Sequence, residues 1–204
     1  MTNRQLFLQH IGQTSEAPLA LEIVKAEGCK LYDVNGAAYI DLIGGISVCN
    51  IGHSHPEVVK AVQEQAAKYM HLIVYGEFIE SPQVQYASLL ASHLPQNLDC
   101  VYFTSSGAEA TEGALKLARR ITGRSQLISC HNAYHGNTMG SLSVMGFEER
   151  KQVFRPMIPD VDFITFNNEA DLERSTTKTA GVLLEIIQGG AGFIQPENDF
   201  LEKV

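Results

Sequence analysis

Apolar residues alternate with polar ones near the start of this 204-residue chain, and they recur at helical spacing further along. Residues 20–43 carry short alternating runs, and an Asn35-Gly36 turn stands before the last of them. This pattern predicts a small antiparallel sheet with a hairpin. The spacing then predicts helices over 56–70 and 82–94.

From residue 100 onward, short apolar runs alternate with helical stretches. Expected strands cover 100–104, 126–130, 161–166 and 180–187, and expected helices cover 107–122, 147–155 and 168–174. This alternation is typical of an α/β fold, in which helices flank a mainly parallel sheet. We expect an N-terminal segment with the small antiparallel sheet over 1–55, followed by a large domain over 56–204.

Helical spacing also predicts which faces are buried. The expected stripes are Val58, Val59, Val62, Ala66 and Tyr69 in the first helix, Val84, Ala87, Leu90 and Ala91 in the second, and Ala110, Ala114, Leu117, Ala118 and Ile121 in the third. Gly123 stands where a left-handed cap ends the third helix. In the same helix, Glu112 and Lys116 are four residues apart, a spacing that predicts a supporting ion pair.

Composition and charge narrow the class of protein. A formal net charge of −8 and a pI near 5.3 argue against nucleic acid or an anionic membrane as the main partner. Residues 1–10 lack the features of a signal peptide, and no apolar stretch approaches the roughly 18 residues of a membrane span. The four cysteines, Cys29, Cys49, Cys100 and Cys130, are predicted to be reduced core residues of a cytoplasmic protein.

The run from Thr104 to Arg119 joins an expected strand to an expected helix through small residues. The first amides of a helix lack partners within it and lie at the positive end of its dipole, so they attract anions. Ser106 can cap this helix, Gly107 lets a phosphate approach the backbone, and Ala108 keeps the next side chain small. The alternative is an ordinary serine-capped helix without a ligand.

Two further segments carry candidate chemistry. Tyr134 and His135 follow the expected strand 126–130. Ligands collect outside the carboxyl ends of strands in open parallel sheets, so this loop and the 104–108 turn should face the same crevice. A tyrosine there can cover a flat ring, or simply pack in a loop. Glu185 interrupts an apolar strand and needs a ligand or a salt-bridge partner. His53 and His55 lack a matching ligand cluster, so no metal site is predicted.

Taken together, these segments resemble the class III pyridoxal-phosphate-dependent aminotransferases, which include the acetylornithine, ornithine and 4-aminobutyrate enzymes. The resemblance covers nearly the whole chain. It rests on the order and spacing of Tyr39-Ile40-Asp41-Leu42, Gly44-Gly45-Ile46, Gly52-His53-Ser54-His55-Pro56, Ser106-Gly107-Ala108-Glu109-Ala110, Tyr134-His135-Gly136 and Glu185-Ile186-Ile187-Gln188-Gly189.

The resemblance implies a fold type I large domain that binds pyridoxal 5'-phosphate (PLP). In that family, the amides of Gly107 and Ala108 with Ser106 would hold the cofactor phosphate. Tyr134 would stack on the pyridine ring with His135 beside it, and Glu185 would belong to the network around the ring. An amino-acid or amine donor and a 2-oxo acid acceptor are the implied substrates. A homodimer is implied because the partner subunit normally completes the phosphate site.

The same resemblance predicts that this chain is the N-terminal half of an enzyme. The family's cofactor-binding lysine and the acid beside the pyridine nitrogen lie further along than Val204, and residues 196–204 read as the beginning of a helix. We therefore expect a fragment that carries no catalytic residue and cannot transaminate alone. The alternatives are a non-catalytic phosphate-binding or dimerisation scaffold, and a hydrolase using His135, for which no nucleophile elbow is present.

Three positions bear on the substrate. Asn137 stands where many members carry an arginine that grips a substrate carboxylate. Gly190 stands where members that act on acetylornithine, ornithine or 4-aminobutyrate often carry a glutamate. Both differences remove a charge from the pocket and argue against the usual handling of a dicarboxylate. Ile46 resembles the acetylornithine and 4-aminobutyrate types more than the ornithine type. Because these signals conflict, the sequence leaves the amino donor open.

Overall fold

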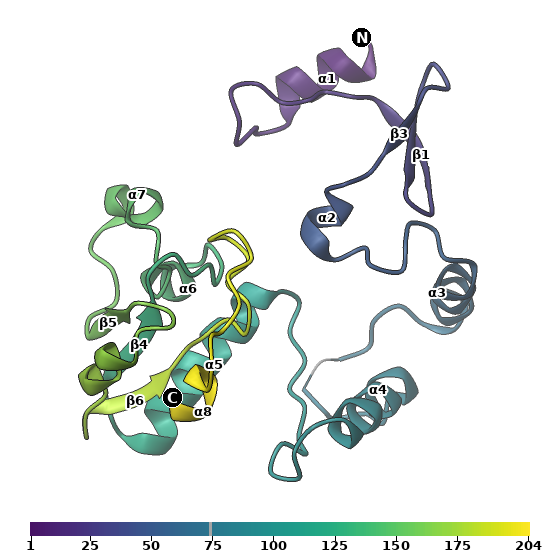
Figure 1. The fold of residues 1–204 in the computed structure, drawn as a ribbon. Helices are drawn as coiled ribbons and strands as arrows, with labels where there is room; N and C mark the ends of the chain where they lie inside the picture. The colour runs from purple at the N-terminus through teal and green to yellow at the C-terminus, as the bar shows by residue number, and fades with distance from the viewer. Residues whose placement is uncertain (74) are drawn as a thin grey trace. The chain divides into compact units, whose positions relative to one another are not determined.

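A computed structural model describes residues 1–73 and 75–204 of the chain (Figure 1). These residues form two compact units, Met1–Phe78 and Ile79–Val204, each considered by itself below. The domain boundary predicted after residue 55 falls within the first unit. It stays a prediction about the domains of the complete protein.

The first unit contains the predicted antiparallel sheet. Strands β1 (Ile23–Glu27), β2 (Lys30–Asp33) and β3 (Ala38–Ile40) lie in the order β1-β2-β3. Asp33 stabilises the turn after β2, because one carboxylate oxygen accepts from the amides of Asn35 and Ala37, each at 2.9 Å. The hairpin prediction is therefore confirmed.

The described residues of this unit also form the helices α1 (Asn3–His10), α2 (Gly44–Ser47) and α3 (Pro56–Lys68). The prediction of α3 is confirmed, but its expected stripe is not buried, since Val58, Val59 and Val62 are all exposed. Neither α1 nor α2 was predicted. In α2 the backbone from Gly44 to Ser47 has φ between 53° and 65°. Glycines adopt such positive φ values readily, but nothing in the sequence predicts them for Ile46 and Ser47.

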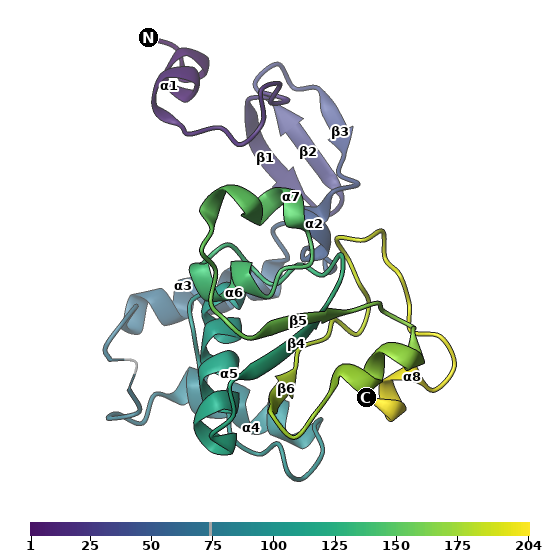
Figure 2. The same cartoon turned by 90° about the vertical axis from the view of Figure 1, so that its left-hand side faces the viewer.

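The second unit contains the predicted parallel sheet (Figure 2). Strand β4 (Gln126–Cys130) lies between β5 (Val161–Ile164) and β6 (Thr179–Val182), and both pairings are parallel. The helical segments are α4 (Ser81–Ser92), α5 (Gly107–Thr122), α6 (Met139–Ser143), α7 (Glu148–Lys151), η1 (Gln152–Phe154), η2 (Glu169–Arg174) and α8 (Phe200–Lys203). The expected α/β fold is confirmed.

Two predicted strands differ from the structure. Residues 100–104 form no strand, and Tyr102 is 82% exposed, because a strand needs a hydrogen-bonded neighbour and the described residues supply none there. The strand predicted over 180–187 ends at Val182, so Glu185 lies beyond it. Helix α6, which was not predicted, packs on α5, and the stretch predicted as helical near 147–155 is divided between α7 and η1.

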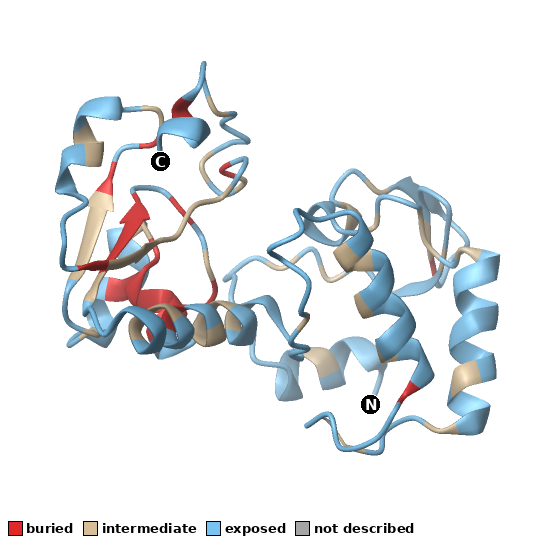
Figure 3. Ribbon diagram, turned by 90° about the horizontal axis from the view of Figure 1, so that it is seen from below, coloured by how far each residue is buried: buried red, intermediate tan, exposed pale blue. Residues whose placement is uncertain are grey.

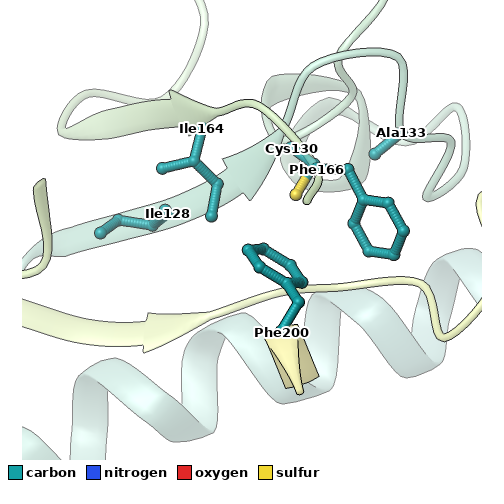
Figure 4. Packing of buried hydrophobic residues seen from close by; sticks show 6 residues of the cluster. All are labelled: Ile128, Cys130, Ala133, Ile164, Phe166 and Phe200. Atoms are coloured by element: carbon teal, nitrogen blue, oxygen red, sulfur yellow. The ribbon is translucent and has the colours of Figure 1, made fainter. Parts of the chain in front are cut away.

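Figure 3 marks the buried residues of the second unit in red. Two apolar clusters form its core, and they contain neighbouring residues of β4. Leu127 packs with Leu115 of α5 and Val144. Its neighbour Ile128 belongs to the other cluster, because successive strand side chains point to opposite faces. That cluster contains Ile128, Cys130, Ala133, Ile164, Phe166 and Phe200 (Figure 4).

The buried face of α5 differs from the prediction. Leu117 and Ile121 are 55% and 74% exposed, and Ala110 and Ala114 are exposed as well. Leu115 is the buried residue of the helix, and Ala118 is half-buried. Helix α5 is apolar on two sides, so spacing alone did not identify the side that faces the sheet. In α4, the predicted stripe is only partly buried: Ala87, Leu90 and Ala91 are half-buried, and Val84 is exposed.

The cysteine prediction also needs correction. All four cysteines are free thiols, but Cys29 and Cys100 are exposed and Cys49 is half-buried, so only Cys130 is a core residue. Apolar neighbours in sequence did not bury the others, because the segments around Cys29 and Cys100 lie at the surface of their units. Burial raises the pKa of the Cys130 thiol to about 12, which keeps it protonated and unreactive.

Candidate functional site

Helix α5 begins as predicted, with Ser106 as its N-cap. The Ser106 hydroxyl oxygen accepts from the amide of Glu109 at 3.2 Å, and the Glu109 carboxylate accepts from the amide of Ser105 at 2.8 Å. The helix ends at Gly123, whose left-handed φ of 68° is the predicted cap. The Ser106 cap gives the Glu109 amide an acceptor, but it gives none to the amides of Gly107 and Ala108.

The corner in front of Gly107 is open. Within the described residues, neither the amide of Gly107 nor that of Ala108 has a hydrogen-bond acceptor. A Cβ added to Gly107 would meet no atom within 4 Å, and Gly107 does not have a left-handed φ. Neither backbone conformation nor packing requires glycine there, and without a Cβ the backbone stays accessible to an anion.

The loop that follows β4 lies directly against this helix start. Gly136 has a φ of 126°, and a Cβ placed on it would come within 2.7 Å of both the Ala108 Cβ and the Ser141 hydroxyl oxygen. Glycine is therefore required at 136 by conformation and by contact. The expectation that the two segments share one region of the sheet edge is confirmed by this contact.

Tyr134 lies in that loop and is 39% exposed. The guanidinium carbon of Arg150 is 5.9 Å from the centre of the Tyr134 ring and 5.1 Å from that of Phe147. A Cβ on Gly190 would lie 3.3 Å from the Phe147 ring and 3.5 Å from the Tyr134 Cβ. Tyr134 is thus an accessible aromatic surface, and a side chain at position 190 would lie against the Phe147 ring.

His135 points back into the protein. Its Nε2 atom is 3.1 Å from the Ser129 hydroxyl oxygen in β4, and burial lowers the pKa of the imidazole to about 4. The side chain is therefore neutral at pH 7 and supports the loop from beneath. This orientation gives His135 a structural contact with β4.

This pKa predicts an acid-sensitive contribution to stability. Between about pH 6.5 and 4 the unfolded chain protonates His135 while the folded chain does not, so the contribution is complete above pH 6.5 and falls as the pH drops toward 4. The expected loss is up to about 3 kcal/mol in the free energy of unfolding. Urea unfolding of the complete protein at pH 7 and 4.5 measures it; His135→Asn should reduce the difference, and His93→Asn, at an exposed position, should not.

Glu185 follows β6 and brings a carboxylate next to the same loop. Its Oε2 atom is buried without a hydrogen-bond partner among the described residues. Burial raises the pKa of this carboxyl, while the nearby amides of Tyr134 and Gly189 act in the opposite direction. A buried polar atom without a partner is costly, so this carboxylate fits a polar group of a ligand or of further chain.

The two predicted substrate-pocket residues are both exposed. Asn137 belongs to the loop of the second unit, next to Gly136. Ile46 belongs to α2 in the first unit; it is 84% exposed and has a φ of 65°, which is unusual for a β-branched residue. The Asp41 carboxylate supports this turn by accepting from the amides of Ile43 and Gly44.

His53, one of the two histidines considered for metal binding, pairs with a carboxylate. His53 Nε2 is 2.7 Å from Asp41 Oδ2, and the pKa of Asp41 is lowered mainly by this contact. In residues 1–73 and 75–204, no group of three or more His, Cys, Asp or Glu side chains is placed to hold a metal ion.

Lys151 is a buried lysine that the sequence did not single out. Its amine donates to the Met145 carbonyl at 2.8 Å and lies 4.0 Å from the centre of the Phe163 ring. Burial lowers its pKa, against the opposing effect of Glu148. Because the amine is engaged by the backbone and an aromatic ring, Lys151 is a structural residue of the α7 turn.

Glu112 of α5 lies next to the candidate site, and the sequence did not predict its contacts. Its Oε1 atom accepts from the Thr138 hydroxyl at 2.5 Å and from the amides of Gly140 and Ser141 at 2.8 and 3.2 Å. The predicted pair with Lys116 is not among the ion pairs of the described chain. The spacing offered one signal that Glu112 faces the protein, because Ala108, Glu112 and the buried Leu115 share one face of the helix.

The sequence pattern of the family described as "Aminotransferase class-III" matches residues 11–204. The chain belongs to this family. An acetylornithine aminotransferase of Bacillus anthracis is 40% identical over 198 residues, which cover 97% of this chain and 50% of that protein. A putative LysW-aminoadipate semialdehyde/glutamate semialdehyde transaminase of Pyrococcus furiosus is 41% identical over 183 residues, covering 89% of this chain and 49% of that one. The chain thus spans about half the length of these curated relatives.

Solved structures agree with this assignment. A transaminase from the marine bacterium Virgibacillus has a TM-score of 0.89 at 28% identity, covering 98% of this chain and 51% of that one. The taurine:2-oxoglutarate aminotransferase of Bifidobacterium kashiwanohense, solved with PLP and glutamate, has a TM-score of 0.85 at 26% identity over 97% of this chain and 50% of that one. PLP is the cofactor of this class of enzyme. Among the described residues, no helix has the length and apolar character needed to cross a membrane.

Proposed function

We propose that the complete protein containing this chain is a PLP-dependent aminotransferase that moves an amino group from an amino acid or ω-amine to a 2-oxo acid. The observation that carries the proposal is the open pair of amides at Gly107 and Ala108, held against the loop that presents Tyr134. An anion seat next to an accessible aromatic ring fits a phosphorylated planar cofactor.

Each cofactor contact has a proposed role. The amides of Gly107 and Ala108, with the Ser106 hydroxyl, bind the phosphate, and Tyr134 covers one face of the ring. Glu185 supplies the buried carboxylate near the ring, which fits its unpartnered Oε2 atom. His135 is proposed to lie beside the ring, with its imidazole held in place by the hydrogen bond to Ser129.

PLP supplies the electron sink that stabilises negative charge on the substrate carbon. The residues of this chain bind and orient it: the helix start fixes the phosphate, and Tyr134 restrains the ring and excludes water from one face. The lysine that bonds to the cofactor in this family is assigned to the rest of the complete protein, so no catalytic residue is proposed within residues 1–204.

The amino donor is proposed to be acetylornithine-, ornithine- or 4-aminobutyrate-like. Asn137 and Ile46 are proposed to line the substrate pocket. Asn137 offers an amide where many relatives offer a guanidinium, which weakens recognition of a substrate carboxylate at this point. The named relatives act on semialdehyde- or ornithine-derived substrates, which supports this group of donors.

The remaining proposals concern assembly and location. We propose a homodimer in the cytoplasm, with a boundary between the N-terminal segment and the PLP-binding domain after residue 55. The net charge of −8 supports a small-molecule enzyme without a nucleic-acid or membrane partner.

Absorption spectroscopy of the complete protein tests the proposal. We expect a visible absorption band from bound PLP that borohydride abolishes, together with amino transfer from acetylornithine, ornithine or 4-aminobutyrate to 2-oxoglutarate. Bound PLP without amino transfer to any 2-oxo acid would favour the non-catalytic scaffold. A colourless protein that takes up no PLP would overturn the proposal.

A further inference from the structure

We propose that Glu112 is a positioning residue that fixes the ring-covering loop to the helix that binds the cofactor phosphate. The inference rests on the proposed function, because it concerns the placement of Tyr134 relative to Gly107. It replaces the supporting pair with Lys116 that the helical spacing predicts.

The Glu112 carboxylate engages three donors from one short segment. Its Oε1 atom accepts from the Thr138 hydroxyl at 2.5 Å, the Gly140 amide at 2.8 Å and the Ser141 amide at 3.2 Å. The Thr138 hydroxyl oxygen is also 2.8 Å from the Ser141 hydroxyl oxygen. One ionised oxygen therefore organises the whole turn that follows Asn137, through charge-assisted bonds.

The Glu112 carboxylate packs directly against Gly140. A Cβ on Gly140 would overlap this carboxylate and displace it, although Gly140 does not have a left-handed φ. The absence of a side chain at position 140 therefore lets Glu112 reach the turn. The carboxylate and the turn are thus fitted to each other.

The second attachment of the loop lies one helical turn away. Ala108 and Glu112 are four residues apart and share one face of α5. Ala108 contacts Gly136, and Gly136 also contacts Ser141, so the segment from 136 to 141 is attached to α5 at both ends. Tyr134 and His135 immediately precede the first attachment.

This arrangement links the two parts of the proposed site. Ala108 contributes an amide to the phosphate seat, and the loop that rests on it carries Tyr134. Without Glu112, this segment loses its charge-assisted hydrogen bonds to α5. It keeps the contact of Gly136 with Ala108 and the packing of Val144 on Leu115. Because misplacement of a group by about 1 Å can cost 100-fold in rate, loosening this turn is expected to impair ring placement more than folding.

The test uses the complete protein and three variants: Glu112→Ala, Glu112→Gln and Lys116→Ala. The readouts are the Kd for PLP, the induced circular dichroism of bound PLP, and hydrogen exchange at the Gly140 and Ser141 amides. Thermal unfolding of the PLP-free protein monitors folding. The glutamine variant keeps an acceptor oxygen and covers the case in which alanine prevents folding.

We expect Glu112→Ala to weaken PLP binding about tenfold, since hydrogen bonds to a charged group are among the stronger ones and this carboxylate accepts three of them from the turn. It should also diminish the induced dichroism and accelerate exchange at Gly140 and Ser141. Glu112→Gln should restore part of each signal, and Lys116→Ala should change none. Unchanged dichroism and exchange in Glu112→Ala, or equal losses in Lys116→Ala, would overturn the inference.

The hydrogen-exchange readout separates this inference from the proposed function. If the wild-type protein takes up no PLP, the proposed function fails. Exchange in the PLP-free protein then still decides whether Glu112 holds the 138–141 turn: faster exchange in Glu112→Ala supports the attachment, and unchanged exchange contradicts it.

Discussion

Replacing Gly107 by aspartate is expected to weaken PLP retention in the complete protein by about 100-fold. The helix start contributes up to about 2 kcal/mol to binding an anion, and like charges about 4 Å apart repel by about 1 kcal/mol even in water. The new carboxylate would fill the open corner and would accept hydrogen bonds from the amides that otherwise bind the phosphate. Equilibrium dialysis or a fluorescence titration with PLP measures the loss.

Folding should not suffer from the same change. An acidic side chain in the first turn stabilises a helix by about 0.3–1 kcal/mol, and Gly107 has open space in front of it. The PLP-free variant should therefore unfold at the same temperature as the wild type or above it. Weaker PLP binding together with an equal or higher unfolding temperature would identify the start of α5 as an anion-binding site.

Gly113→Asp is the matched control, since it places the same charge further along α5 at a position where a Cβ also meets no atom within 4 Å. It should leave PLP retention close to wild type. Unchanged retention in Gly107→Asp would place the phosphate elsewhere, and equal losses in both variants would indicate a general effect of charge.

Gly146→Ala is expected to destabilise the second unit by about 3 kcal/mol or more, within the range of overpacked interior sites. An added Cβ would overlap the Cys130 carbonyl oxygen and the Asn132 amide nitrogen, which are backbone atoms that cannot turn aside. The Gly146 amide also donates to the Ala133 carbonyl at 2.8 Å. Urea unfolding followed by circular dichroism measures the loss.

The control for this variant is Gly113→Ala, which adds a methyl group to open space in a helix. It should be neutral or stabilising by up to about 1 kcal/mol, because glycine is a poor helix former. Since Ala133 directly precedes Tyr134, Gly146→Ala should also impair PLP binding where the protein still folds. Wild-type stability in Gly146→Ala would contradict this packing of the 130–133 turn.

Much of the second unit was predictable from its sequence. Helix α5 begins at Gly107 and ends before Gly123 as predicted, because Ser106 and Gly123 are caps whose action depends on neighbouring backbone groups. The parallel strand β4 was predicted with its bounds, since an apolar run between turns is a local signal. The proximity of the 104–108 and 134–138 segments also followed, because ligand-binding loops gather at the carboxyl ends of parallel strands.

Other features depended on contacts between residues distant in sequence. The apolar content of residues 100–104 predicted a strand, but strands require a neighbour. Spacing predicted a Glu112–Lys116 pair, whereas Glu112 bonds to Thr138, Gly140 and Ser141. These donors were not recognisable in advance, since α6 itself was not predicted.

The chain's residue pattern was sufficient to establish its α/β class, the capped start of α5 and its family, because caps, turns and motif spacing act over a few neighbouring residues. The three-dimensional arrangement was needed to show which face of α5 is buried, that His135 bonds to Ser129, and that Glu112 holds the turn after Asn137. Those features depend on which distant segments meet, and such meetings follow from the packing of the whole unit rather than from local preference.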